Sequence, residues 1–161
     1  MFISHLTILQ ESDALREFRA EFQEIASEED IDKILNYKID EVSQRERGII
    51  KAYQAAGTSM MAEYVFSPMS KLKFFNKGKT ALEGLIDSSK DVEKVYLRLL
   101  IQLNVPKTLN YHKNIEGDIS YLQEHMAEAQ IEASFKSLMI NNLLSITKKE
   151  KLKEAILDIK L

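Results

Sequence analysis

Apolar side chains recur every three or four residues along most of this chain, and that spacing constrains the fold more than any other feature. Leu15, Phe18, Phe22 and Ile25 give a clear example, with charged residues between them. No segment alternates apolar and polar residues for long enough to predict a strand. Because the 161 residues include two prolines and five glycines, few positions interrupt a helix. The sequence therefore predicts an all-α fold.

We expect seven to eight helices with short connections, arranged as antiparallel helical hairpins in one domain over residues 1–161. Helix starts are predicted from residues that cap helices well: Ser12, Ser27, Asp91, Asn114 and Thr147. Ser67-Pro68 is predicted to end one helix and begin the next, because the residue before proline avoids helical dihedrals. Asn104 and Pro106 are predicted to end another helix.

Small residues mark places where helices break or cross. Gly57-Thr58-Ser59 either separates two helices or admits a closely packed neighbour. Gly78 and Ala81 lie within the apolar stripe of the helix that begins at Pro68, where they would let another helix approach. That stripe comprises Leu72, Phe75, Leu82, Leu85 and Ile86. The segment 92–103 is apolar over a wide arc, so we expect its helix at the centre of the core.

Composition excludes several classes of protein. Cysteine is absent, so disulfides and thiolate metal sites are excluded. Residues 1–47 hold 12 acids and 6 bases, and an acidic front end argues against general nucleic-acid binding. We expect no membrane span, because no stretch of 18 apolar residues is free of charge. MFISHLTILQESD has no basic region before its short apolar run, so we expect no signal peptide and, by default, a cytoplasmic protein.

The segment KLKFFNKGKTALEGLIDSSKDVEKVYLRLL resembles a tetratricopeptide-type helical hairpin. Gly78, Leu82 and Leu85 match the second helix of such a repeat, and Tyr96 and Leu99 match the opening of the next. Lys90 stands where the repeat usually has proline, and Leu100 stands where it often has glycine. This resemblance covers one repeat junction, and it implies a stacked α-α superhelix or bundle.

Two further stretches, AEYVFSPMSKLKFFNKGK and YLRLLIQLNVPKTLNYHKNIEGD, resemble a family of small, uncharacterised helical proteins from Bacteroidetes. The likeness covers roughly residues 50–125. It implies a common fold and a common polar cluster, and it implies no particular activity. Members of that family often carry an export signal, which this chain does not show.

The polar residues around Pro106 form the candidate site. They are Arg98, Gln102, Asn104, Asn110, Tyr111, His112 and Asn114. On one interpretation Arg98 holds an anionic group in a pocket, and the amides and Tyr111 orient it. On the other, these groups satisfy helix ends, with Arg98 paired to a carboxylate of a neighbouring helix. The second interpretation is favoured, since helix caps require these residue types.

Two other patterns favour ordinary structure over chemistry. In KLKFFNKGK, Lys73 and Lys77 share one helix face, while Phe75 belongs to the apolar stripe, so solvated lysines beside a core phenylalanine are expected. The histidines, at positions 5, 112 and 125, have no metal-binding spacing, and we expect no metal and no cofactor. No catalytic set of residues is evident.

The sequence therefore favours a non-enzymatic helical module that binds a protein or peptide partner in a groove between helices. The alternative is a small-molecule binding protein or an enzyme that uses the polar cluster around Pro106. A third possibility is homo-oligomerisation through the apolar helix expected over residues 135–146.

Overall fold

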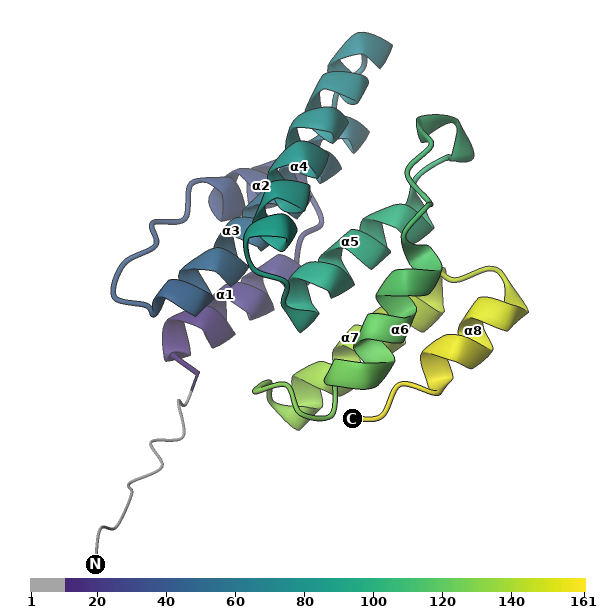
Figure 1. Ribbon diagram of the computed structural model, residues 1–161. Coiled ribbons are helices and arrows are strands. Elements are labelled where there is room, and N and C mark those ends of the chain that lie inside the picture. Colours follow the sequence, from purple (N-terminus) through teal and green to yellow (C-terminus); the bar gives the residue numbers. More distant parts are fainter. Residues whose placement is uncertain (1–10) are drawn as a thin grey trace, which may run out of the picture.

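The structure, a computed structural model, describes residues 11–161 (Figure 1). These residues form eight α-helices and two short 3₁₀ helices, and none of them lies in a strand. The α-helices are α1 (Asp13–Gln23), α2 (Glu28–Leu35), α3 (Gln44–Met60), α4 (Pro68–Ser88), α5 (Val92–Asn104), α6 (Ile115–His125), α7 (Ala133–Ile146) and α8 (Glu150–Leu157). The 3₁₀ helices are η1 (Met61–Glu63) and η2 (Lys107–Leu109). The all-α prediction is confirmed.

Most helix starts follow from their caps. The side chains of Ser12, Ser27 and Ser67 each accept a hydrogen bond from a backbone N–H in the first turn of α1, α2 and α4, and Asp91 does the same for α5. Ser43 and Glu46 form a reciprocal capping box at the start of α3.

Of two further predicted caps, Asn114 is right in position and Thr147 is wrong. Asn114 precedes α6, but its side chain makes no capping bond, because its backbone folds in the helical region. Thr147 ends α7 instead of starting α8, and its hydroxyl donates to the carbonyl of Leu143. A threonine hydroxyl bonds backbone groups at either end of a helix, and the sequence alone does not distinguish them.

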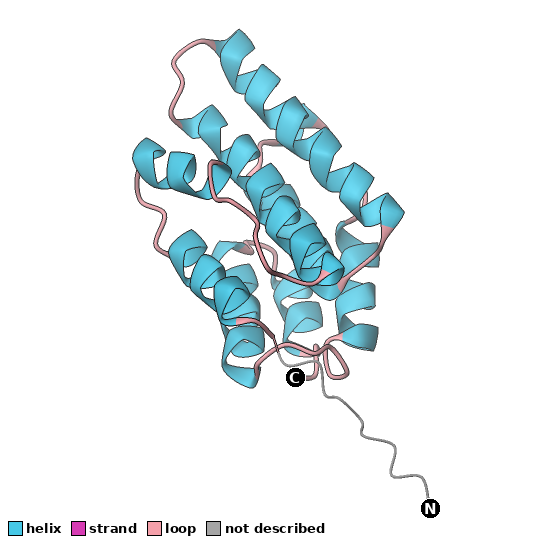
Figure 2. Ribbon diagram, turned by 90° about the vertical axis from the view of Figure 1, so that its left-hand side faces the viewer, coloured by secondary structure: helices cyan, strands magenta, loops and turns pink. Residues whose placement is uncertain are grey.

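Consecutive helices pack as adjacent antiparallel pairs (Figures 1 and 2). Helices α3 and α4 form the most extensive interface, and α5 lies against α3, α4, α6 and α7. Val95, Tyr96 and Leu99 of α5 are fully buried, so the prediction of a central helix is confirmed. Helix α1 also contacts α3, α3 contacts α5, and α5 contacts α7, so these four helices form one continuous row.

Gly57 and Gly78 lie where α2 and α4 pack against α3, but Ala81 is exposed, so its predicted place at a helix crossing is wrong. Helix α3 continues through Gly57, so this position is not a break. Helix α2 packs beside it, and a Cβ on Gly57 would make ordinary contacts with Leu35, Ile34 and Ile31 at 3.6–3.8 Å. A Cβ on Gly78 would lie 2.4 Å from the carbonyl oxygen of Ala55. Only glycine therefore permits the observed approach of α4 to α3.

The apolar stripe of α4 departs from prediction at one end. Phe75, Leu82 and Ile86 are buried, but Leu72 is 47% exposed, so its placement in the core is wrong. Most residues of the first turns of α4 are exposed, so no other helix covers this end of the stripe. Phe66 and Met69, in the same region, are 100% and 82% exposed.

None of the helices in residues 11–161 is both long enough and apolar enough to cross a bilayer. The segment MFISHLTILQ, which bears on the expected absence of a signal peptide, and His5 lie outside the described residues.

Candidate functional site

The structure brings Arg98 and Gln102 together on one face of α5, one turn apart. Arg98 donates from Nε and Nη2 to the two carboxylate oxygens of Asp118 in α6, at 2.9 and 2.5 Å. Gln102 donates to the same carboxylate at 2.8 Å. This fork-shaped pairing is the strong form of an Arg–carboxylate contact. Since all three side chains are buried, it ties α5 to α6 inside the molecule.

A second carboxylate extends the cluster to α4 and to the segment before α6. Glu83 accepts from Nη1 of Arg98 at 2.8 Å and from the hydroxyl of Tyr111 at 2.5 Å. Gln102 completes the network, because its carbonyl oxygen accepts from the backbone N–H of Asn114 at 3.1 Å. The cluster therefore joins α4, α5 and α6, and it also fixes the chain between α5 and α6.

The other predicted residues do not join this cluster. Asn104 and Asn110 are exposed, and Asn110 adopts a left-handed conformation (φ 49°) at the end of η2. Asparagine tolerates that conformation better than most residues. His112 contacts the carbonyl oxygen of Val105 through Nε2 at 3.1 Å. Asn114 takes part through its backbone alone.

The positive charge of Arg98 is balanced inside the protein by the carboxylates of Asp118 and Glu83. Burial alone would lower the pKa of Arg98, but its bonds to Asp118 and Glu83 outweigh that effect and raise the pKa. Burial and the bond to Glu83 raise the pKa of Tyr111 well above its ordinary value. Both groups therefore keep their protons at neutral pH, Arg98 as a cation and Tyr111 as a neutral hydrogen-bond donor.

The hydrogen-bonding capacity of this cluster is used inside the protein. Among residues 11–161, no buried side-chain nitrogen or oxygen lacks a hydrogen-bond partner. Sequence reasoning anticipated a carboxylate for Arg98, but it did not identify Asp118 or Glu83. An arginine in an otherwise apolar helix face was the available signal, because such a charge requires a partner. The small-molecule or enzymatic use of this cluster stays a prediction.

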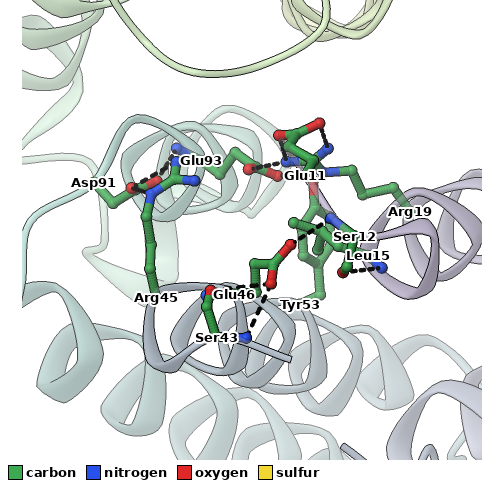
Figure 3. Close-up of polar contacts among 10 residues, drawn as sticks. All are labelled: Glu11, Ser12, Leu15, Arg19, Ser43, Arg45, Glu46, Tyr53, Asp91 and Glu93. Atoms are coloured by element: carbon green, nitrogen blue, oxygen red, sulfur yellow. Dashed lines mark hydrogen bonds and ion pairs between the residues drawn. The ribbon is translucent and has the colours of Figure 1, made fainter. Parts of the chain in front are cut away.

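A second buried network, which sequence reasoning missed, lies between α1, α3 and α5 (Figure 3). Arg19 of α1 bonds both carboxylate oxygens of Glu93, and it also bonds both oxygens of Glu11 at 2.8 Å. Tyr53 donates to Glu93 at 3.0 Å. Burial raises the pKa of Glu93, while the hydrogen bonds from Arg19 and Tyr53 oppose that rise. The guanidinium of Arg19 also lies over the ring of Phe135, 4.7 Å from its centre.

Polar side chains at the rim of this network fasten the start of α1 to α3. Glu46 accepts from the backbone N–H of Ser12 at 2.7 Å and from that of Ser43 at 3.0 Å (Figure 3). Although burial raises the pKa of Glu46, these bonds lower it by more, so the net shift is downward. Arg45 pairs with Asp91 at 3.2 Å across α3 and α5. These contacts are accounted for by the joining of helices.

The chain also has an apolar groove between its inner helices, of about 300 Å³. Its walls come from α1, α3, η1, α4, α5 and α7, and α5 contributes more lining residues than any other helix. The lining residues are Phe22, Ala56, Ser59, Met60, Glu63, Phe75, Leu97, Leu100, Ile101, Asn104, Val105 and Ile146. Asn104 is therefore the predicted site residue that lies in a groove, and it lies there without the rest of the polar cluster.

The exposed apolar side chains noted above lie close along the chain to two residues of this groove. Phe66, Met69 and Leu72 belong to the stretch of chain that joins Glu63 to Phe75, and those two residues both line the groove. Large apolar side chains that are exposed near one another commonly mark an interaction surface.

Metal ligation finds no support in the described part of the chain. No group of three or more His, Asp or Glu side chains in residues 11–161 is arranged to hold a metal ion. His125 stacks on the ring of Tyr121, with the ring centres 4.1 Å apart.

Comparison with known proteins adds no family to this description: no family model, no curated protein and no solved structure matches the chain.

Proposed function

We propose that the protein is a helical module related in architecture to tetratricopeptide hairpins, and that its apolar groove binds an apolar or amphipathic segment of a partner protein. The observation that carries this proposal is the groove itself; Phe66 and Met69 are exposed on the chain segment between Glu63 and Phe75, two of its lining residues. Both side chains are largely in solvent, where they contribute little to folding. A partner that covers them would remove apolar area from water and gain binding free energy.

The residues that line the groove favour a peptide as its occupant. Its walls are mostly aliphatic and aromatic, while Ser59, Glu63 and Asn104 supply a few polar groups that would orient a ligand. An amphipathic helix can lay its apolar face into such a groove and leave its polar face in water. The succession of contacts from α1 through α3 and α5 to α7 supports the relation to stacked helical hairpins.

A peptide selection tests the proposal. We would select peptides from a random displayed library against the immobilised full chain and measure their affinities by fluorescence anisotropy. The expected peptides are apolar or amphipathic, and Phe66→Ser together with Met69→Ser should weaken them about tenfold or more. Leu157→Ser is the matched control, because Leu157 is 65% exposed on α8, outside the groove.

A second pair of variants tests the groove directly. Asn104→Trp would fill it from an exposed position and should abolish binding. Asn141→Trp, on the exposed side of α7, makes the same chemical change elsewhere and should leave binding unchanged. The proposal fails if the selection yields no binders, or if the selected peptides bind Asn104→Trp as tightly as the wild-type chain.

A further inference from the structure

The hairpin of α3 and α4 carries a second hollow, on the face opposite the apolar groove. At 100° per residue, Lys51 and Thr58 of α3 point about half a turn away from Ala56 and Met60, and on α4 Lys77 and Gly84 point away from Phe75. Two adjoining hollows of about 600 and 470 Å³ share Lys51 and Leu85. We name them together the basic groove. Its lining residues are Leu35, Gln44, Arg45, Arg47, Gly48, Lys51, Gln54, Ala55, Thr58, Lys77, Ala81, Gly84, Leu85, Ser88, Ser89, Asp91 and Lys94.

Positive charge is concentrated in this groove. Its lining includes five basic side chains, those of Arg45, Arg47, Lys51, Lys77 and Lys94, and one acidic side chain, that of Asp91. Asp91 is already paired with Arg45. The chain as a whole has a formal charge of −3, so this local excess runs against the overall balance. A hollow lined by one sign of charge attracts ligands of the other sign.

Two of these cations, Lys51 and Lys77, are free to meet a ligand, and Arg47 is exposed as well but donates to the carbonyl oxygen of Ile39. Lys51 and Lys77 are exposed, and neither forms an ion pair with a carboxylate of residues 11–161. Lys94 is different, because its ammonium is buried and donates to the carbonyl oxygens of Leu85 and Ser89 at 3.1 and 2.7 Å. Lys94 therefore holds the end of α4, and the binding charge comes from the two lysines at the rim.

Between these lysines the groove is lined by residues with little or no side chain. A Cβ on Gly84 would meet nothing within 4 Å, so packing inside the protein does not require glycine there. Its φ is not positive either, and glycine in the middle of a helix is otherwise unfavourable. Because Gly84 and Ala81 carry little or no side chain, another chain can pass close to the backbone of α4.

We propose that the basic groove binds an acidic segment of a partner protein, with carboxylates on Lys51 and Lys77 and with the partner's backbone passing over Gly84. The groove has no aromatic side chain in its lining on which a base could stack, and this favours a peptide over single-stranded nucleic acid. Leu35 and Leu85 offer apolar contact between the charges. The inference is independent of the apolar groove, because the two hollows occupy opposite faces of α3 and α4.

The test uses a fluorescein-labelled peptide of alternating glutamate and alanine, ten residues long, and the full chain at low salt. Wild-type protein should bind this probe, and added salt should weaken the binding. Lys51→Glu combined with Lys77→Glu should weaken it about tenfold or more. Lys148→Glu combined with Lys151→Glu is the matched control, since it makes the same change in net charge near α8 and should leave more of the affinity intact.

Gly84→Leu tests the shape of the groove without any change in charge. It should block the peptide while leaving the helix intact, as circular dichroism would verify. The inference is overturned if the wild-type chain does not bind the probe, or if a peptide with glutamine for glutamate binds equally well. It is also overturned if both charge-reversed doubles lose affinity equally, or if a short single-stranded RNA binds the groove more tightly than the peptide.

Discussion

A single added methyl group on α4 should reveal how closely α3 and α4 approach. In Gly78→Ala the new Cβ would lie 2.4 Å from the carbonyl oxygen of Ala55 and 2.6 Å from the backbone nitrogen of Ser59. Ordinary van der Waals contact begins at 3.4 Å, so the two helices must separate by roughly 1 Å. These two atoms belong to the backbone of α3 and cannot move aside, unlike the third obstructing atom, the side-chain hydroxyl oxygen of Ser59.

The magnitude follows from comparing this change with the same change two turns later. Alanine stabilises a helix interior by about 1 kcal/mol relative to glycine, and this gain applies to both Gly78 and Gly84. Overpacking costs about 1–3 kcal/mol, and it applies to Gly78 alone, because a Cβ on Gly84 meets nothing within 4 Å. The propensity gain cancels in the difference. Gly84→Ala should therefore be more stable than Gly78→Ala by about 1–3 kcal/mol.

Thermal and urea denaturation of the two variants and the wild-type chain measure this difference. For a chain of this length each kcal/mol shifts the melting temperature by about 2–4 °C. Gly84→Ala should melt above the wild type, and Gly78→Ala should melt below Gly84→Ala. If the two variants have the same melting temperature, or if Gly78→Ala is the more stable, then α4 does not approach α3 closely at Gly78.

Other predictions test the core and the buried ions by urea denaturation. Leu99→Ala should cost about 2–5 kcal/mol because Leu99 is fully buried in the central helix, and an unchanged midpoint would contradict that position. Arg98→Ala leaves the carboxylate of Asp118 buried without its cation and should cost about 3–5 kcal/mol, whereas a cost below ~1 kcal/mol would mean that water reaches this carboxylate. The pKa of Glu46 is lowered on folding, so its stabilising contribution is complete above its ordinary value of 4.5 and is lost as pH falls through the folded value. The stability advantage of the wild type over Glu46→Gln should accordingly shrink below pH 4.5, and a constant advantage would refute the shift.

Helix positions could be predicted from the sequence because they depend on local rules. A serine or aspartate before an apolar stripe caps a helix by bonding its own first turn, so Ser12, Ser27 and Asp91 needed no knowledge of the rest of the chain. The missing side-chain bond at Asn114 and the wrong helix start at Thr147 have a physical origin too. Asn114 gives its backbone N–H to Gln102, a partner 12 residues away, and such a contact does not appear in a local pattern.

The candidate site was predictable only in part. Arg98 and Gln102 are one turn apart, so their common direction followed from the helical period alone. Their convergence on Asp118, and the link from Tyr111 through Glu83, depend on how α4, α5 and α6 pack. The network around Arg19 was beyond prediction for the same reason, because its partner Glu93 lies 74 residues away along the chain.

Two features of the α3–α4 hairpin do not contribute to the stability of the fold, and both bear on function. Phe66 and Met69 are exposed at positions where polar residues would make the protein more soluble. Gly84 weakens its helix, although no neighbouring atom prevents a larger residue there. Neither feature helps the isolated chain to fold, whereas each would help a surface that a partner covers. If the exposed pair serves binding, Phe66→Ser with Met69→Ser should leave the melting temperature unchanged while it weakens peptide affinity. A fall in stability would instead show that Phe66 and Met69 pack against the protein itself and are not available to a partner.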